Sequence, residues 1–132
     1  MLSWQVGDVK ITRIVEMETV GGTRFLLPQA TYEAVQAIPW LSPHFAEPGG
    51  KLKMSIHALV VEAPGRRIIV DTCIGNDKQR EMEPWSNLQT TFLADLEAAG
   101  FARESIDTVL CTHLHVDHVG WNTMRVDGRW VP

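Results

Sequence analysis

A short stretch near the end of the sequence concentrates side chains that bind metal ions. Residues 113–118 read His-Leu-His-Val-Asp-His, so four potential ligands, His113, His115, Asp117 and His118, fall within six residues. Imidazole nitrogens and carboxylate oxygens hold zinc, and they also suit iron or manganese. Packing does not require such a run, whereas a hydrolytic metal centre does. We therefore predict that this segment binds metal ions.

The spacing of these ligands indicates two ion sites. His113 and His115 lie two residues apart, so on an extended segment they project to the same side and can share one ion. Asp117 and His118 are adjacent, and a bend would turn both toward a second ion about 3.5–4 Å from the first. A metal-bound water has its pKa lowered from about 16 to about 7, and the resulting hydroxide can attack a carbonyl or phosphoryl centre.

A hairpin, a helix and a strand are predicted to position the motif. Residues 55–62 are apolar on both faces, as in the interior of a sheet, and after a Pro64-Gly65 turn residues 67–71 return as a second strand. A helix is predicted from a capping box at Ser86 to a C-terminal glycine, Gly100. Its apolar positions recur at helical spacing, at Leu88, Phe92, Leu96 and Ala99.

A short, buried strand is predicted to follow at residues 108–112. The order strand, helix, strand predicts that this strand runs parallel to residues 67–71. Sites in such sheets form beyond the carboxyl ends of the strands, where Asp71 follows one strand and His113 follows the other. Asp71 could therefore orient a ligand histidine from behind the site, or it could merely initiate a turn. We favour the orienting role.

Three further elements are predicted outside this unit. Polar and apolar residues alternate over residues 9–17, which indicates a half-exposed edge strand whose apolar face carries Val9, Ile11, Val15 and Met17. A short helix is expected at residues 31–37, before Pro39. Asp127-Gly128 predicts a hairpin turn between residues 123–126 and 129–131.

Composition narrows the class of protein. The chain has 132 residues, enough for one domain at most, and its net charge of −4 comes without a basic patch, so we predict no nucleic-acid partner. No apolar run has the length of a membrane span, no signal peptide is recognisable, and Cys73 and Cys111 have no metal-type spacing. We expect a cytoplasmic protein, not bound to a membrane, with a small-molecule substrate; a homodimer is left open.

At these residues the sequence resembles the metallo-β-lactamase superfamily of metallohydrolases. The resemblance rests on residues 112–120, on Ile69-Val70-Asp71-Thr72 and on the hairpin, helix and strand order between them. It implies an α/β (α+β) fold, an αβ/βα sandwich with a mixed sheet. It also implies two zinc ions, with iron or manganese as alternatives, of which one is held by His113 and His115 and the other by Asp117 and His118. Asp117 would also act in catalysis by orienting the hydroxide, and Asp71 would be the structural carboxylate behind the site.

The resemblance extends only to part of a member of that family. Family members are about twice this long and take another histidine, a bridging aspartate and a last histidine from their downstream half. After His118 this sequence has no histidine, and its only later acid is Asp127. We therefore expect residues 1–132 to form a single, incomplete domain, the N-terminal half of a longer enzyme.

Three functional hypotheses follow. The first is a metal-dependent hydrolase of esters, lactones or phosphoesters, and residues 118–121 resemble the lactonase and organophosphate-hydrolase-like branches of the superfamily. The second is an iron-binding redox or sulfur-handling member that uses the same ligands. The third is that the 132-residue chain alone is a non-catalytic metal-binding fragment. We favour the first for the parent protein.

Overall fold

A computed structural model describes residues 2–132 of the chain, which divide into two compact units. Unit 1 contains the residues up to Glu16 together with Ile56–Pro132, and unit 2 is Met17–Ser55. The predicted motif, the long helix, the parallel strand and, from Ile56 on, the hairpin belong to unit 1. Within the described residues no helix is both long enough and apolar enough to span a membrane.

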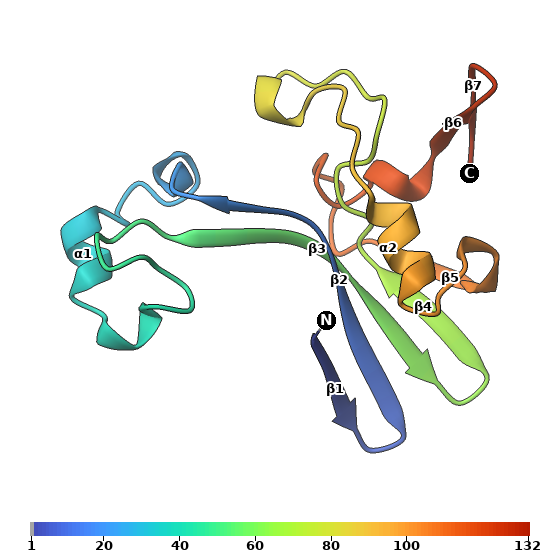
Figure 1. Cartoon of the computed structure of the whole chain (residues 1–132), viewed down its shortest axis with the longest axis horizontal. Coiled ribbons are helices and arrows are strands. Elements are labelled where there is room, and N and C mark those ends of the chain that lie inside the picture. Colours follow the sequence, from blue (N-terminus) through green and yellow to red (C-terminus); the bar gives the residue numbers. More distant parts are fainter. Residues whose placement is uncertain (1) are drawn as a thin grey trace. The chain divides into compact units, whose positions relative to one another are not determined.

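A mixed sheet of five strands organises the chain (Figure 1), which confirms the predicted α/β class. The order across the sheet follows the sequence: β1 (Leu2–Val6), β2 (Val9–Val20), β3 (Lys53–Ala63), β4 (Arg66–Val70) and β5 (Thr108–Leu110). Strands β3 and β4 form the predicted antiparallel hairpin. Strands β4 and β5 are parallel, with Val70 opposite Leu110, so the two strands end at the same level.

Helix α2 (Phe92–Ala98) carries the chain from β4 to β5, and it begins later than predicted. Ser86 does not cap it: the Ser86 hydroxyl accepts a hydrogen bond from the backbone N–H of Arg80 at 3.1 Å. The Thr90 N–H likewise donates to Asn76 Oδ1 at 2.7 Å. Because the preceding loop takes up these groups, residues 86–90 stay irregular and the predicted capping box is wrong.

The end of α2 is as predicted. Gly100 has a φ of 91°, a left-handed conformation that favours glycine. Its N–H donates to Glu97 O at 2.8 Å, and the N–H of Phe101 donates to Leu96 O at 3.1 Å, which is the hydrogen-bond pattern of a Schellman motif. The cap turns Phe101 back toward Leu96, and both side chains enter the core.

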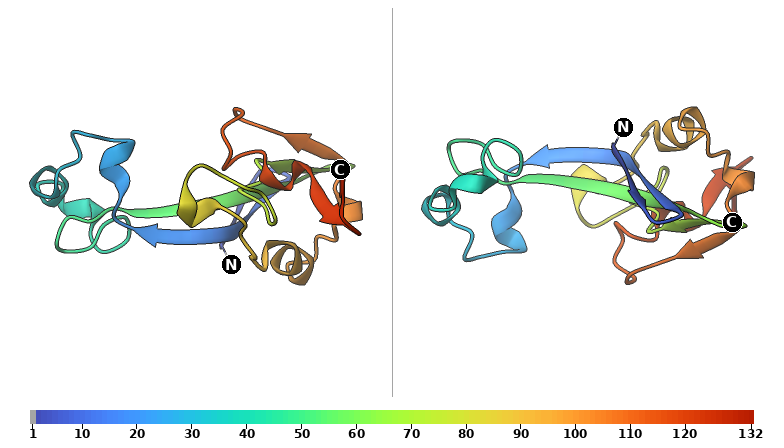
Figure 2. Two further views of the ribbon diagram at one scale, coloured as in Figure 1. Left: turned by 90° about the horizontal axis from the view of Figure 1, so that it is seen from above. Right: turned by 90° about the horizontal axis from the view of Figure 1, so that it is seen from below.

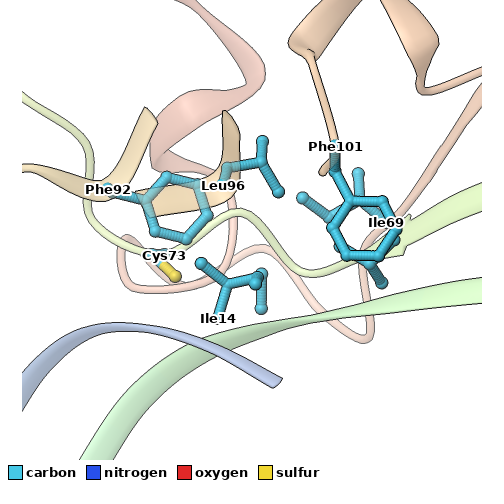
Figure 3. Close-up of a cluster of buried hydrophobic side chains, with 8 residues drawn as sticks. Ile14, Ile69, Cys73, Phe92, Leu96 and Phe101 are labelled. Atoms are coloured by element: carbon cyan, nitrogen blue, oxygen red, sulfur yellow. The ribbon is translucent and has the colours of Figure 1, made fainter. Parts of the chain in front are cut away.

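The core of unit 1 lies between α2 and the sheet (Figure 3). It is built from small and medium-sized side chains of the strands and of the turn after β4, and from larger ones of the helix and its flanks: Ile14, Ala58, Val60, Ile69, Cys73, Phe92, Leu96 and Phe101. Phe92 is fully buried, and its ring stacks on Trp121 with 5.9 Å between centroids. Burial of one such side chain stabilises the fold by about 1.5–3 kcal/mol. The core therefore anchors the segment that follows the metal-binding motif.

Strand β2 presents the opposite face to the one predicted. Ile14 is 3% exposed and Thr12 is also buried, whereas Ile11 and Val15 are half-buried. Nor is β2 an edge strand, because β1 pairs with it, with Leu2 opposite Arg13. The polar-apolar alternation gave the period correctly, but the packing of α2 decides which face is inside.

Strand β5 is not the buried strand that was predicted. Val109 and Leu110 are each 50% exposed. The strand stands last in the sheet order, so it has a neighbouring strand on one side only. Figure 2 shows α2 to one side of β3 and β4 and the segment after β5, in red-orange, to the other.

The remaining elements are short. Unit 2 contains η1 (Thr23–Phe25), α1 (Tyr32–Gln36) and η2 (Pro39–Leu41). Helix α1 confirms the helix expected at residues 31–37, and the Thr31 hydroxyl caps it by accepting from Ala34 N at 3.2 Å. In unit 1, η4 is Arg103–Ser105, and η3 (Glu83–Trp85) lies in the loop before α2. Strands β6 (Met124–Val126) and β7 (Arg129–Val131) form the hairpin expected around Asp127-Gly128, and η5 (Gly120–Asn122) precedes them.

Candidate metal centre

The predicted metal-binding motif, residues 113–118, occupies the irregular segment that follows β5. Its last residues form a turn closed by a hydrogen bond from His118 N to His115 O at 3.0 Å, which provides the predicted bend before Asp117 and His118. A further bend lies at His113, so the first two histidines do not share one straight strand. The turn gathers the rings: the centroid of His113 lies 4.7 Å from that of His115 and 3.9 Å from that of His118.

The first two histidines form one donor pair. Nε2 of His113 lies 3.1 Å from Nδ1 of His115. Two nitrogens bound at 2.0–2.1 Å to one tetrahedral zinc ion would lie about 3.3 Å apart. The observed separation is therefore suited to a shared ion, and it equally allows a shared proton. The pair matches the first of the two sites expected from the spacing.

The adjacent residues Asp117 and His118 form a second donor pair. Oδ2 of Asp117 lies 3.3 Å from Nε2 of His118. The other ring nitrogen of His118, Nδ1, lies 2.8 Å from Oδ2 of Asp71. An ionised carboxylate only accepts hydrogen bonds, so Nδ1 must be the protonated nitrogen. In the neutral ring the lone pair then lies on Nε2, which is 3.3 Å from the acceptor Oδ2 of Asp117, and a cation bound by both atoms would relieve their repulsion.

Asp71 lies behind the motif and joins it to the end of β4. Its Oδ1 accepts from the backbone N–H of Thr112 at 2.8 Å, and the Thr112 hydroxyl lies 2.8 Å from Oδ2. Burial raises the pKa of Asp71, but the hydrogen bonds from His118 and Thr112 outweigh it, so the pKa lies below the ordinary 3.8. A carboxylate that stays ionised and holds a histidine by its outer nitrogen is the usual support of a metal ligand. Sequence reasoning did not identify Thr112 as its partner.

The four side chains supply two pairs of donor atoms, and each pair suits a divalent metal ion. Each pair is open, because two donors leave the other coordination positions of an ion unfilled. Two imidazole nitrogens face each other in one pair, and an imidazole nitrogen faces a carboxylate oxygen in the other. Both sets have the chemistry that zinc prefers. Among residues 2–132, no group of three or more His, Cys, Asp or Glu side chains is arranged to enclose an ion. Each pair would need ligands from outside this motif, as the sequence predicted.

Backbone hydrogen bonds fix the motif against the turn that follows β4. Thr72 N donates to His118 O at 2.8 Å, Gly120 N donates to Cys73 O at 2.7 Å, and the N–H of Trp121 donates to Thr72 O at 2.8 Å. The two backbones touch at Gly120, where an added Cβ would lie 1.9 Å from the carbonyl carbon of Ile74. Glycine at position 120 is thus a steric requirement, and a glycine two residues after His118 was its signal in the sequence.

The cysteines take no part in this donor set. Cys73 is completely buried in the core, and burial raises the pKa of its thiol, so it stays protonated. Cys111 is half-buried, and its sulfur accepts from Asn122 Nδ2 at 3.4 Å. His57 is half-buried on β3, and His44 is exposed in unit 2.

Comparison with known proteins gives one family. The family model described as the metallo-beta-lactamase superfamily matches residues 53–131. None of the curated proteins matches the chain.

Several solved structures, among them the following three, are similar to this chain. One is a probable metal-dependent hydrolase from Staphylococcus aureus, with 23% identity and a TM-score of 0.61 over 89% of this chain and 42% of that one. Another is AidC, described as a dizinc quorum-quenching lactonase in complex with a product, N-hexnoyl-L-homoserine (21% identity, TM-score 0.64, 90% of this chain and 37% of that one). The third is AbOPH, a hydrolase in the beta lactamase superfamily (23% identity, TM-score 0.59, 89% and 37%). The chain therefore spans about two-fifths of each of these structures, and the likeness confirms the fold.

Proposed function

This chain belongs to the metallo-β-lactamase superfamily, and on that premise we propose that it is the metal-binding part of a metal-dependent hydrolase. The proposal is carried by two pairs of donor atoms. Nε2 of His113 and Nδ1 of His115 lie 3.1 Å apart, and Oδ2 of Asp117 and Nε2 of His118 lie 3.3 Å apart. Both separations suit two ligands of one tetrahedral ion. The two pairs also share the segment that directly follows β5, at the end of the parallel strands, where sites form in such sheets.

The proposed ions are two zinc ions. His113 and His115 would hold one, and Asp117 and His118 the other. When bound, such ions supply Lewis-acid chemistry: they lower the pKa of a coordinated water and stabilise negative charge on an oxyanion. The description of AidC as a dizinc lactonase supports the choice of zinc over iron or manganese.

The chain's own residues would orient the reacting groups. Asp71 holds the proton of His118 on Nδ1, which keeps Nε2 free as a ligand. The carboxylate of Asp117 can accept a hydrogen bond from the attacking water and so align it, which is the catalytic role proposed for this residue. The role of Asp71 requires no change of its charge at neutral pH, because hydrogen bonds hold its pKa below the ordinary value.

The proposed substrate is a small molecule with a carboxylic ester, lactone or phosphoester bond. In each, the attacked carbon or phosphorus gains an anionic oxygen in the transition state, which a cationic site stabilises. The similar structures described as a lactonase and as hydrolases support this class. Activity is proposed for the intact parent protein, because this chain covers only 37–42% of those structures.

The test is hydrolysis by the intact protein, purified without chelator and supplied with zinc. A chromogenic ester, a lactone and a phosphotriester are assayed beside His115→Ala and the control His44→Ala, whose histidine is exposed in unit 2. We expect His115→Ala to lower kcat/KM by about 10² or more, since an ion contributes several kcal/mol, while His44→Ala retains activity. Turnover that survives His115→Ala, or no turnover of any of the three substrates, would contradict the proposal.

The 132-residue chain assayed alone under the same conditions addresses the fragment hypothesis. The two open donor pairs lead us to expect no turnover from it. Robust turnover by this chain that His115→Ala abolishes would show that residues 1–132 are sufficient.

A further inference from the structure

A second carboxylate, that of Glu16 on β2, collects hydrogen bonds from three separate segments. Oε2 accepts from the backbone N–H of Ile74 at 2.7 Å, and Oε1 accepts from that of Gly75 at 3.2 Å. Oε1 also accepts from the hydroxyl of Thr90 at 3.2 Å and from the indole Nε1 of Trp121 at 2.7 Å. Oε1 faces three of these donors and Oε2 one. The Thr90 hydroxyl also lies 3.2 Å from Asn76 Oδ1, so its single proton is shared, and the two backbone N–H groups and the indole N–H are the donors committed to Glu16.

The hydrogen bonds of Glu16 differ from those of an ordinary surface carboxylate, because its partners are protein groups from three segments. The consecutive N–H groups of Ile74 and Gly75 form the kind of concavity that binds anions, and Glu16 occupies it from within the protein. Ile74 is completely buried, so its N–H has no access to water. The alternation over residues 9–17 predicts an inward face of Val9, Ile11, Val15 and Met17, which leaves Glu16 on the opposite, outward face. The inverted face of β2 explains why its role was missed.

The turn that Glu16 holds is the one to which the metal-binding motif is attached. Residues 72–75 follow Asp71 directly, and Thr72 and Cys73 exchange backbone hydrogen bonds with residues 118–121. Trp121, bound by its side chain to Glu16, lies three residues after His118. A shift of this turn or of the indole would therefore move the backbone of His118 and the carboxylate of Asp71 together.

We propose that Glu16 is a positioning residue for the metal-binding segment: it fixes the 72–75 turn and the Trp121 indole, and through them the placement of His118 and Asp71. The inference rests on the proposed function, because His118 is a proposed ligand. Glu16 is not proposed to touch metal or substrate. Its effect should appear in the affinity for the ion held by Asp117 and His118.

The perturbing variant is Glu16→Gln in the intact protein. Glutamine keeps the shape but replaces one acceptor oxygen with an NH₂ donor, which then faces N–H or O–H donors. Outer partners of metal ligands typically contribute 10–100-fold to affinity, and Glu16 acts one step further away, so we expect zinc affinity to fall about tenfold. Competition with a chromophoric chelator measures it. The matched control is Glu62→Gln, whose carboxylate lies 3.8 Å from Lys10 Nζ on the strand surface.

A double-mutant cycle separates positioning from a general loss of stability. Trp121→Phe removes the indole N–H but keeps a ring to stack on Phe92. The quantity to compare is the fold loss of zinc affinity that Glu16→Gln causes in each background. If Glu16 acts through Trp121, this loss should be at least about threefold smaller in the Trp121→Phe background than in the wild-type background. Fully additive effects, or zinc affinity of Glu16→Gln equal to wild type, would overturn the proposal. Trp121→Phe alone gives the milder test if Glu16→Gln does not fold.

A metal-free readout distinguishes failure of this inference from failure of the proposed function. The ¹⁵N shifts of the His118 ring and amide exchange of Gly120 report the placement of the motif without any ion. Both should change in Glu16→Gln and stay unchanged in Glu62→Gln. If the wild type binds no zinc, the proposed function fails, and these two signals still decide whether Glu16 positions the motif; unchanged signals in Glu16→Gln would overturn it.

Discussion

Substitution of Asp71 by asparagine isolates the contribution of the carboxylate behind the motif. Asparagine has almost the same size, but only one of its two terminal atoms accepts hydrogen bonds. Asp71 accepts from His118 Nδ1 at 2.8 Å and from Thr112 N at 2.8 Å through different oxygens. If the amide oxygen keeps the Thr112 N–H, the NH₂ group faces His118, so the proton of that ring must move to Nε2.

The magnitude follows from the bond that is lost. A hydrogen bond to a charged group contributes about 1.5–3 kcal/mol. At about 1.4 kcal/mol per tenfold change, this corresponds to a roughly 10- to 150-fold weaker affinity for an ion at Asp117 and His118. The range agrees with the 10–100-fold that outer partners of metal ligands typically contribute. We expect the ion held by His113 and His115 to be much less affected.

Chelator competition on the intact protein measures this loss, and Asp127→Asn is the matched control. Asp127 lies in the β6–β7 turn with a φ of 49°, a conformation that asparagine adopts readily. In the metal-free protein, the ¹⁵N shifts of His118 should show the proton on Nδ1 in the wild type and on Nε2 in Asp71→Asn. A zinc affinity within about twofold of wild type, with the proton still on Nδ1, would refute this account of Asp71.

The same variant has a consequence for acid stability. The pKa of Asp71 in the folded chain is lowered below 3.8, because hydrogen bonds outweigh the opposing effect of burial. A group with a lowered folded pKa stabilises the fold above its unfolded pKa, and that contribution disappears as the pH falls through the folded value. Asp71→Asn should therefore flatten the loss of unfolding free energy below about pH 4. An acid-unfolding profile identical in slope to wild type would contradict it.

The remaining predictions concern backbone contacts and thiols. Gly120→Ala would place a Cβ 1.9 Å from the carbonyl carbon of Ile74, so urea unfolding should show that the free energy of unfolding falls by about 3 kcal/mol. A decrease of less than about 1 kcal/mol would mean that the contact is absent. Gly100→Ala meets no atom within 4 Å but has a φ of 91°, so it should destabilise by about 1–2 kcal/mol, and an unchanged midpoint would contradict the left-handed cap. A thiol reagent should modify half-buried Cys111 in the folded protein and Cys73 only on unfolding, and early modification of Cys73 would show that the core is open.

Local patterns predicted most elements of this fold but not their faces. The apolar residues of β3 and the Pro64-Gly65 turn indicated the hairpin, and Gly100 indicated where α2 ends, because turns and caps depend on nearby residues. The start of α2 was wrong because Ser86 bonds to Arg80 in a loop whose path the sequence does not reveal. The predicted inward face of β2 was wrong because that face is decided by the packing of α2. Ile14 of β2 and Phe92 of α2 share the core but lie 78 residues apart in the sequence.

The candidate metal centre was predictable to a similar extent. Spacing alone gave the two donor pairs, and strand order gave the meeting of Asp71 with the motif, since parallel strands end at one edge. The role of each residue as a ligand stays a prediction. The sequence could not reveal that Glu16 accepts hydrogen bonds from several segments, because its four partners lie 58 to 105 residues away along the chain. Contacts at such separations are set by topology and not by a local pattern.

Anomalous diffraction from crystals of the intact protein with zinc tests the central claim most directly. The account predicts two peaks, one within bonding distance, about 2.0–2.2 Å, of His113 Nε2 and His115 Nδ1, and one equally close to Asp117 Oδ2 and His118 Nε2. Zinc bound elsewhere, or the absence of zinc from all four of these atoms, would contradict it.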